Sequence, residues 1–409
     1  MQIKSRYGLI GKTLKHSFSK GIHNRLGKYD YELYPLREDQ LNEFALDKKI
    51  SGFNVTIPYK TDIIEYLTEI DQRAKDIGAV NTVVRKKKGL KGYNTDFDGM
   101  VYMLNSANIT LKDKVVMILG SGGTSKTAEA VAKHLGAKRV FKVSRSGEIN
   151  YQNYNSQTDV QVIINTTPVG MFPNNYDAPV DLSGFDRLEG VADVVYNPML
   201  TMLCFNAKNR GLKHVNGLAM LVAQAKFASE KFKGRPIADT KIDEIIREMK
   251  SKSTNVVLVG MPGSGKSTIA KEVAKRLKRQ FIDTDKEIEK KAGMSIPDIF
   301  SEYGEGRFRE IEKQVLREVG AMTGKVIATG GGVVKDSENL YPLKSNGIIF
   351  WIKRDATKLV TKGRPLSKDL ETVKKLYEER KDKYLAFSDH QIDNDGELLT
   401  AVKGVLEKL

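Results

Sequence analysis

The stretch GMPGSGKST, residues 260–268, has residue types and spacing suited to binding a nucleoside triphosphate. It follows a short apolar run and precedes a helical pattern, which is the context in which the motif G-x-x-x-x-G-K-[ST] grips phosphate. Glycines let backbone N–H groups curl around the anion, Lys266 would reach the β- and γ-phosphates, and Ser267 would ligate Mg²⁺. The motif is shared by kinases, ATPases and GTPases. The candidate nucleotide-binding residues are Gly260, Gly263, Ser264, Gly265, Lys266, Ser267 and Thr268.

Two carboxylates follow shortly after this loop, in the segment QFIDTDKEIE at 280–289. If the predicted strand continues through them, the side chains of Asp283 and Asp285 point to the same side. One could then assist Mg²⁺ while the other accepts a proton from a substrate hydroxyl. The alternative is that both are solvated acids of a loop.

A second glycine-rich turn, GSGGTS at 120–125, also stands between an apolar run and a helical pattern. Because Ser125 occupies the position of the third glycine in G-x-G-x-x-G, the turn alone is a weak signal for a dinucleotide. The next predicted strand ends at Ser144, Arg145 and Ser146. NAD enzymes usually place an acid there for the ribose hydroxyls, whereas an arginine suits the 2′-phosphate of NADP, so the sequence favours NADP.

The elements that must position these residues are short apolar runs alternating with helical patterns. Continuous apolar runs are typical of strands buried on both faces of a parallel sheet. The sequence therefore predicts an α/β fold in which the order strand, glycine turn, helix occurs twice, at 115–135 and 256–277. The runs are 115–119, 160–164, 191–195, 256–259, 326–328 and 348–352. An amphipathic helix that turns polar near 250–254 predicts a linker there.

The composition of the chain limits the classes of protein to which it can belong. The chain has 409 residues, of which 40% are hydrophobic and 29% charged, as expected for two or three globular domains. No apolar run is long enough for a transmembrane helix, the first 20 residues lack the apolar centre of a signal peptide, and Cys204 is the only cysteine, so we expect a cytoplasmic protein. The net charge of +16 is scattered in short runs, which favours attraction of small anions over nucleic-acid binding.

The motifs after the phosphate loop, GEGRFREIEKQVL, VIATGGGVV, KGRPL and LYEERKDKY, form a specific series. Over about 254–409 the chain resembles shikimate kinase, a small P-loop enzyme similar to nucleoside-monophosphate kinases. The resemblance implies that Asp285 binds the ring hydroxyls of shikimate and acts as the base, and that Asp283 supports Mg²⁺. It also implies the carboxylate-binding Arg309 and Arg380, the closely approaching Gly330, Gly331 and Gly332, and the lid residue Arg364 at the transferring phosphoryl group.

The first 248 residues carry a second series of motifs, which together resemble shikimate dehydrogenase. They are HSFSKGIHN at 16–24, GFNVTIPYK at 52–60, GAVNTV at 78–83, GYNTDFDG at 92–99, INTTPVGM at 164–171, DVVYNPMLTML at 193–203 and NGLAMLVAQA at 216–225. The chain departs from the family pattern in three ways: Lys20 stands where a proline is usual, Ser144 replaces the asparagine before the cofactor arginine, and no second basic residue follows shortly after Arg145.

This resemblance implies that Lys60 and Asp96 form the catalytic pair at the reacting oxygen. A ketone that receives hydride develops charge on its oxygen, so a cation or proton donor there lowers the barrier, and a carboxylate keeps the lysine oriented. For the substrate, the resemblance implies Ser17 and Ser19 at the carboxylate, Thr56, Asn81 and Gln224 at ring hydroxyls, and Tyr196 in the pocket wall. For the cofactor, it implies Gly120, Gly122, Gly123, Thr124 and Ser125 at the pyrophosphate, Arg145 at the 2′-phosphate, and Thr166, Gly217 and Met220 near the nicotinamide.

The two resemblances together imply a dehydrogenase of two lobes followed by a P-loop kinase domain. A substrate-binding lobe is expected at 1–104, completed by helices within 218–250, with a Rossmann NADP-binding lobe at 105–217 and the kinase at 254–409. The implied function is reduction of 3-dehydroshikimate by NADPH, followed by phosphorylation of shikimate by Mg²⁺ and ATP. No nucleic acid or membrane partner is expected. The alternatives are a catalytically inactive half that senses a ligand, or a first half that prefers quinate or NAD.

Overall fold

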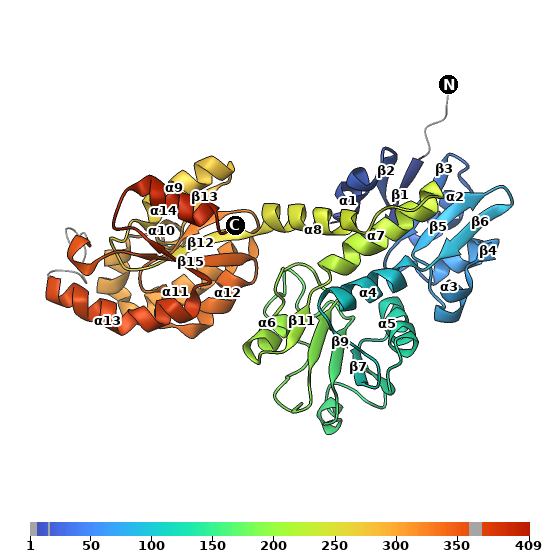
Figure 1. Ribbon diagram of the computed structural model, residues 1–409, viewed down its shortest axis with the longest axis horizontal. Coiled ribbons are helices and arrows are strands. Elements are labelled where there is room, and N and C mark those ends of the chain that lie inside the picture. The colour runs from blue at the N-terminus through green and yellow to red at the C-terminus, as the bar shows by residue number, and fades with distance from the viewer. Residues whose placement is uncertain (1–5, 15–16, 360–369) are drawn as a thin grey trace. The chain divides into compact units, whose positions relative to one another are not determined.

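The computed structural model describes residues 6–14, 17–359 and 370–409 (Figure 1). The chain divides into two compact units, the first comprising Met1–Asn197 and Thr201–Glu248, the second Pro198–Leu200 and Met249–Leu409. The first unit holds a 6-stranded and a 5-stranded sheet, and the second holds a 5-stranded sheet. Within the described ranges, the structure has no helix of the length and apolar character needed to cross a bilayer.

The first sheet of the first unit mixes parallel and antiparallel pairs in the order β2-β1-β3-β5-β6-β4. Strand β1 is parallel to β2 and β3, whereas β5 is antiparallel to β3 and β6. Its strands are β1 Arg6–Gly11, β2 Asp30–Pro35, β3 Ile50–Val55, β4 Glu69–Ile70, β5 Thr82–Lys86 and β6 Gly89–Tyr93. The helices of this region are α1 Ser19–Leu26, α2 Leu41–Leu46, α3 Gln72–Ile77 and α4 Thr95–Ser106.

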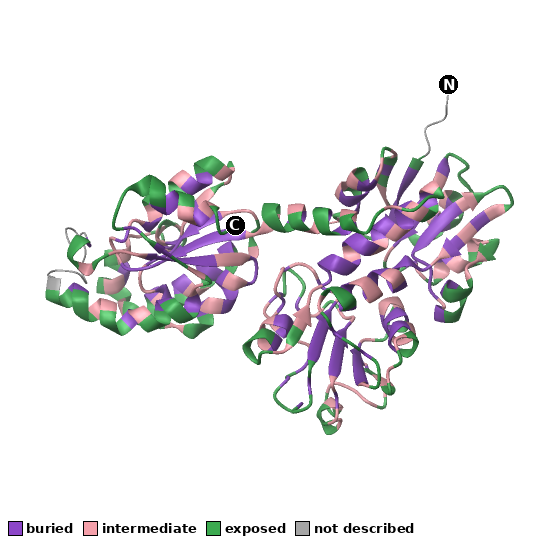
Figure 2. Cartoon of the chain, in the orientation of Figure 1, coloured by how far each residue is buried: buried purple, intermediate pink, exposed green. Residues whose placement is uncertain are grey.

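The second sheet of the first unit is parallel throughout, in the order β11-β10-β9-β7-β8. Its central strand β9 and its neighbours β7 and β10 are buried along their whole length, as Figure 2 shows. The strands are β7 Val115–Leu119, β8 Arg139–Val143, β9 Val162–Asn165, β10 Gly190–Asp193 and β11 Lys213–Val215. The helices are α5 Gly123–His134 and α6 Met202–Asn209.

Helix α7, Leu218–Lys233, packs on both sheets of the first unit and so connects their cores. Near its start, Ala219 and Met220 belong to the apolar cluster of β7 and β9. Near its end, Ala228 and Phe232 belong to the cluster that contains Tyr7 of β1. Helix α8, Thr240–Ser253, follows it.

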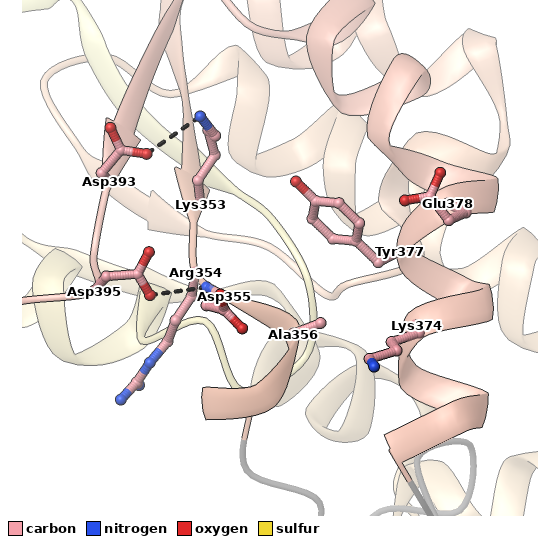
Figure 3. Close-up of a pocket in the computed structure, with 9 residues that line it drawn as sticks. All are labelled: Lys353, Arg354, Asp355, Ala356, Lys374, Tyr377, Glu378, Asp393 and Asp395. Carbon is pink, nitrogen blue, oxygen red and sulfur yellow. Dashed lines mark hydrogen bonds and ion pairs between the residues drawn. The ribbon is translucent and has the colours of Figure 1, made fainter.

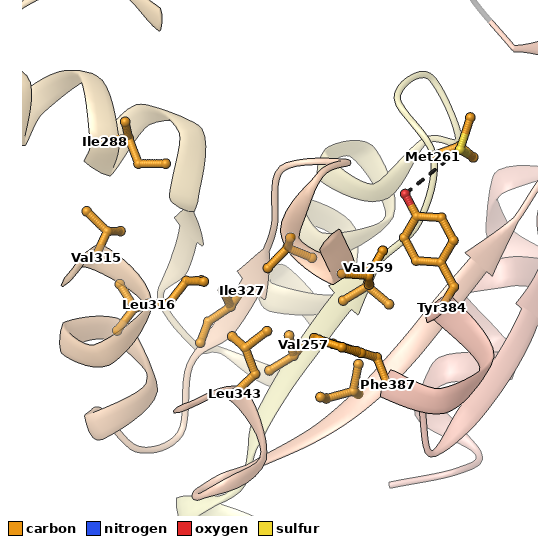
Figure 4. Close-up of a cluster of buried hydrophobic side chains, with 14 of the residues drawn as sticks. Val257, Val259, Met261, Ile288, Val315, Leu316, Ile327, Leu343, Tyr384 and Phe387 are labelled. Atoms are coloured by element: carbon orange, nitrogen blue, oxygen red, sulfur yellow. Dashed lines mark hydrogen bonds between the residues drawn. The ribbon is translucent and has the colours of Figure 1, made fainter. Parts of the chain in front are cut away.

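The sheet of the second unit is also parallel, in the order β13-β14-β12-β15-β16. Successive side chains of a strand face opposite sides, so Val257 and Val259 enter one apolar cluster (Figure 4) and Val256 and Leu258 enter the other. The strands are β12 Asn255–Val259, β13 Phe281–Asp283, β14 Val326–Ala328, β15 Gly347–Lys353 and β16 His390–Asp393. The helices are α9 Lys266–Leu277, α10 Thr284–Ala292, α11 Ile296–Ala321, α12 Leu340–Lys344, α13 Leu370–Phe387 and α14 Leu398–Leu406.

The predicted α/β class with buried parallel strands is confirmed, and each predicted apolar run coincides with or overlaps a strand of a parallel sheet. Residues 250–253, assigned to a linker from their polarity, instead form the last turn of α8. Helical bonding continues there because the backbone N–H of Thr254 donates to the Lys250 carbonyl at 2.9 Å. Strand β12 then begins at once.

Two candidate active sites

The first candidate site contains an ion pair between Lys60 and Asp96. Lys60 lies in the turn after β3 and Asp96 in the first turn of α4, and their Nζ and Oδ2 atoms are 2.6 Å apart. The two side chains are only 15% and 9% exposed. Asn94 caps α4 by accepting a hydrogen bond from the Phe97 N–H at 3.1 Å, which holds the turn that carries Asp96. A lysine held in this way presents its remaining N–H groups in a fixed direction.

The implied substrate residues lie around this ion pair. Asn81 is 3% exposed and accepts a 2.7 Å hydrogen bond from the backbone N–H of Thr95, the residue before Asp96. Gln224 of α7 lies against Gly99, one turn further along α4. Thr56 directly follows β3.

The implied carboxylate-binding serines lie at the start of α1. The Oγ of Ser17 accepts a 3.2 Å hydrogen bond from the backbone N–H of Ser19, the first residue of that helix. Phe18 between them makes an edge-to-face contact with Tyr196, with ring centroids 5.8 Å apart. Tyr196 therefore lies next to the serine pair, although the two are far apart in the sequence.

The glycine turn after β7 comes close to the ion pair. A Cβ added to Gly123 would lie 3.7 Å from Cδ of Lys60. The hydroxyl of Ser125 donates to the Gly120 carbonyl at 2.7 Å and closes the turn. Gly122 is the N-cap of α5 and has no side chain to satisfy the N–H groups of the first turn, which leaves them to an anionic ligand. Thr124 is part of that turn.

The other implied cofactor residues lie at neighbouring strand ends. Gly120 has φ +113°, and a Cβ there would lie 2.7 Å from Oγ1 of Thr166 after β9, so glycine permits the close approach of these two segments. Gly217 is the N-cap of α7, and Met220 is buried within that helix. Arg145 is solvent-exposed in the turn after β8, where an anionic group can reach it.

A buried network around Asp193, at the ends of β9 and β10, was not predicted from the sequence. The Oδ1 of Asp193 accepts hydrogen bonds from Asn165 Nδ2 at 2.9 Å and from the Val195 N–H at 3.0 Å, and its Oδ2 accepts from Thr201 Oγ1 at 2.7 Å. Asn165 in turn accepts from the Thr167 N–H at 3.0 Å. The network therefore fixes the backbone beside both Tyr196 and Thr166. The only sequence feature that marks it is a single acid within the apolar run 191–195.

The second candidate site is built on the loop between β12 and α9. Nζ of Lys266 donates to the carbonyls of Gly260 and Met261, both at 2.9 Å, so the side chain folds back across the loop. Gly265 has φ +91°, and a Cβ there would lie 2.5 Å from Nδ2 of Asn394. That amide donates to the Ser264 carbonyl at 2.8 Å and holds the loop, with Gly263 in it, in its curled form.

The two predicted carboxylates take different positions from those expected. Strand β13 ends at Asp283, so strand alternation does not place Asp285 beside it, and that part of the prediction is wrong. Asp283 is instead the N-cap of α10, and its Oδ1 accepts from the Asp285 N–H at 3.2 Å. Its Oδ2 accepts a 3.0 Å hydrogen bond from Ser267 Oγ, which places a hydroxyl and a carboxylate together as hard oxygen ligands suited to Mg²⁺. Thr268 follows in the first turn of α9.

The glycine run Gly330, Gly331 and Gly332 lies where the implied substrate residues converge. A Cβ on Gly330 would lie 2.5 Å from Oδ1 of Asp285, and one on Gly332 would lie 2.6 Å from Nη2 of Arg309. The Gly331 carbonyl accepts from Arg380 Nη1 at 3.1 Å. The absence of side chains therefore lets one carboxylate and two guanidinium groups approach the backbone of this run closely.

The two arginines beside the glycine run are largely buried, and side-chain and backbone contacts hold them. Arg309 donates to Glu312 at 2.6 Å, and burial raises the pKa of the Glu312 carboxyl. Arg380 is 4% exposed, and its buried Nε has no hydrogen-bond partner among the described residues. Arg364, the implied lid residue, lies outside the described residues.

A cavity of about 490 Å³ lies at the ends of β15 and β16 (Figure 3). Its wall includes Lys353 and Asp393, which form a 3.2 Å ion pair, and Tyr377 of α13. Arg354 of the same wall donates to the Gly263 carbonyl of the phosphate loop at 3.4 Å. The cavity is therefore adjacent to the loop.

The buried Asp193 predicts a pH-dependent contribution to stability. Burial raises the pKa of its carboxyl from 3.8 to about 6, against the opposing effect of its three hydrogen bonds. The folded protein thus binds this proton more tightly than the unfolded chain does, so the stabilising contribution is present below about pH 4 and is lost as pH rises through 6. Asp193→Asn removes the titration while Thr201 can accept from the new amide.

We therefore expect the free energy of unfolding of Asp193→Asn, relative to wild type, to rise by about 2 to 3 kcal/mol between pH 4 and pH 7. Urea unfolding followed by circular dichroism measures it. The exposed Asp186 in the same region provides the matched control, Asp186→Asn, for which we expect no such trend. A difference between Asp193→Asn and wild type that stays constant with pH would contradict the assignment.

Comparison with known proteins identifies a family for each part of the chain. The family model of the shikimate dehydrogenase substrate binding domain matches residues 9–83, and the shikimate kinase model matches residues 262–409. Shikimate dehydrogenase (NADP(+)) of Clostridium beijerinckii is 38% identical over 243 residues, which is 55% of this chain and 90% of that protein.

Solved structures give the same result for the first unit. A chorismate mutase/shikimate 5-dehydrogenase fusion protein from Clostridium acetobutylicum has a TM-score of 0.58 at 36% identity, covering 60% of this chain and 97% of that one. Shikimate 5-dehydrogenase from Thermus thermophilus, in complex with NADP(H) and shikimate, has a TM-score of 0.54 at 25% identity. The match covers 60% of this chain and 99% of that one. Both resemblances found in the motifs are confirmed: the chain belongs to the shikimate dehydrogenase family in its first part and to the shikimate kinase family over residues 262–409.

Proposed function

We propose that this chain performs two consecutive reactions, the reduction of 3-dehydroshikimate to shikimate with NADPH and the phosphorylation of shikimate to shikimate 3-phosphate with ATP. The observation that carries the proposal is that each unit places a set of reactive and charged groups close to its own nucleotide loop. The first has the Lys60–Asp96 pair beside the glycine turn. The second has Asp285, Arg309 and Arg380 around Gly330, Gly331 and Gly332.

In the first reaction, bound NADPH supplies a hydride to the carbonyl carbon of the substrate. The Lys60 ammonium donates a hydrogen bond to the carbonyl oxygen and gives it a proton as charge develops, so the carbonyl becomes a hydroxyl. Asp96, at 2.6 Å, keeps the Lys60 side chain oriented toward the substrate. Ser17 and Ser19 would hold the substrate carboxylate, with Thr56, Asn81 and Gln224 at the ring hydroxyls and Tyr196 against the ring.

The glycine turn and Arg145 fit a phosphorylated dinucleotide. Gly120, Gly122, Gly123, Thr124 and Ser125 would hold the pyrophosphate at the start of α5. Arg145 is a planar cation without a carboxylate beside it in the sequence, which suits the 2′-phosphate that distinguishes NADP from NAD. The similarity to shikimate dehydrogenase (NADP(+)) of Clostridium beijerinckii supports this choice.

In the second reaction, bound ATP supplies its γ-phosphoryl group. Asp285 accepts the proton of the attacking hydroxyl, while Arg309 and Arg380 hold the carboxylate of shikimate. Lys266 would exchange its two carbonyl contacts for the phosphates, and Ser267 and Asp283 would hold Mg²⁺. The cavity at Arg354 is positioned to take the rest of the nucleotide.

We assign the protein to the reducing cytoplasm, since Cys204 is a buried free thiol.

Separate substitutions in the two sites should abolish separate steps. We expect Lys60→Ala to lower the rate of 3-dehydroshikimate reduction by about 10²- to 10⁴-fold, because the developing charge loses its proton donor. Lys266→Ala should lower phosphorylation by at least about 10²-fold, because the phosphates lose their cation. Coupled assays of NADPH oxidation and of ADP release measure the two steps on each variant. Loss of both steps in either variant would contradict two independent sites.

The substitution Arg145→Ala tests whether Arg145 makes the first unit prefer NADP⁺ over NAD⁺. Removing the guanidinium should raise KM for NADP⁺ by about tenfold or more and leave KM for NAD⁺ nearly unchanged, because only NADP⁺ carries the 2′-phosphate. Steady-state rates with each cofactor measure this. Arg139→Ala is a matched control, since Arg139 is an exposed arginine of the same sheet already paired with Asp159 at 2.5 Å. An equal change in KM for both cofactors would show that Arg145 does not bind the 2′-phosphate.

A further inference from the structure

A chain of buried polar groups lies beneath Asn81 and connects it to the helix of Asp96. Its members come from three elements: Asn54 from β3, Thr82 from β5 and Thr95 from the start of α4. The exposed fractions of these residues are 5%, 0% and 1%. Burying hydroxyl and amide groups is unfavourable unless they are hydrogen-bonded, so their partners decide what the chain does.

The Thr82 hydroxyl is the centre of this chain. It accepts from Asn54 Nδ2 at 3.0 Å and lies 2.9 Å from Thr95 Oγ1 and 3.2 Å from Asn81 Oδ1. Asn81 Oδ1 also receives the Thr95 N–H at 2.7 Å and the Thr95 hydroxyl at 3.2 Å. Tyr31 Oη donates to Asn54 Oδ1 at 2.8 Å and so fixes which end of the Asn54 amide points at Thr82.

These contacts give the hydrogen bonds one direction. Asn54 must donate to Thr82, because its Oδ1 is taken by Tyr31. Thr82 therefore donates its own proton onward, toward Thr95 Oγ1 or Asn81 Oδ1, and every route ends on Asn81 Oδ1 as the acceptor. The Oδ1 atom is thus held inward, and the Nδ2 amide of Asn81 is left to donate to a ligand.

We propose that Thr82 is a positioning residue of the dehydrogenase site. It acts through Asn81, fixing the orientation of the amide that meets the substrate ring, and through Thr95 it connects that amide to the first turn of α4, which carries Asp96. The inference rests on the proposed reduction of 3-dehydroshikimate, because Asn81 is assigned to the substrate there.

Packing alone does not require a hydroxyl at this position. Thr82 begins β5, where Val83 and Val84 follow it, and valine has nearly the same shape as threonine and favours strands equally well. Thr82→Val therefore keeps the volume and removes only the hydrogen bonds. The amide of Asn54 would lose its acceptor at Thr82, and Asn81 would lose the partner that orders its oxygen.

The test uses the full chain as wild type, Thr82→Val and Thr82→Ser, assayed for shikimate oxidation by NADP⁺. For Thr82→Val we expect KM for shikimate to rise about tenfold, the size of one ordered hydrogen bond. KM for NADP⁺ and kcat should stay within about threefold, since the Thr82 hydroxyl bonds to Asn54, Asn81 and Thr95 and to no residue assigned to the cofactor or to proton transfer. Thr82→Ser keeps the hydroxyl and should restore KM for shikimate to within about twofold. Phosphorylation of shikimate by the same preparations normalises the protein concentration.

The outcomes separate the possibilities. An unchanged KM for shikimate in Thr82→Val would overturn the inference. So would a loss that lowers kcat, NADP⁺ affinity and the melting temperature together and is not rescued by serine, because that pattern belongs to a structural residue. If Thr82→Val fails to fold, Thr82→Ala is measured in its place with the same expectation. Wild-type protein without shikimate oxidation would overturn the proposed function itself, which the variants do not test.

Discussion

Parallel pairing makes neighbouring strands end at the same edge of a sheet, and both sites of this chain depend on that constraint. In the first unit, β7, β9 and β10 end at Leu119, Asn165 and Asp193, and the glycine turn, Thr166 and Tyr196 come within three residues of these ends. In the second, the phosphate loop follows β12, Asp283 is the last residue of β13, and Gly330 lies two residues after the end of β14. Segments far apart in sequence therefore reach one place, and the chemistry of each site is what their short loops carry.

Crowding at such an edge explains why buried polar groups support the sites. Backbone that leaves a buried sheet must still satisfy its N–H and carbonyl groups. Asp193 does so beneath Tyr196 and Thr166, and Asn394 does so beneath the phosphate loop. Thr82 instead bonds to the side chains of Asn54, Asn81 and Thr95. None of these side chains needs to touch a ligand. Each instead fixes the orientation of a neighbouring group that we assign to ligand binding.

The sequence allowed the parts with a strong local pattern to be predicted. Buried parallel strands are continuous apolar runs, so strands such as β7 and β12 could be located, and the phosphate loop has fixed spacing. Asp285 could not be placed from strand alternation, because the cap that Asp283 provides ends the strand and starts a helix. Thr82, Asn165 and Asp193 could not be assigned at all, since one polar residue in an apolar strand has no spacing signal. The Lys60–Asp96 contact joins two residues that are 36 positions apart in the sequence, and it was expected from family motifs alone.

If one chain carries out both reactions in sequence, the product of the first must become the substrate of the second in a single vessel. Incubating the purified wild-type protein with 3-dehydroshikimate, NADPH and Mg²⁺-ATP, and identifying the products by mass spectrometry, measures this. We expect shikimate 3-phosphate, with one NADPH oxidised and one ATP consumed for each molecule formed. Shikimate that accumulates without phosphorylation, or 3-dehydroshikimate that remains unchanged, would contradict the proposed pair of activities and would identify the unit whose assignment fails.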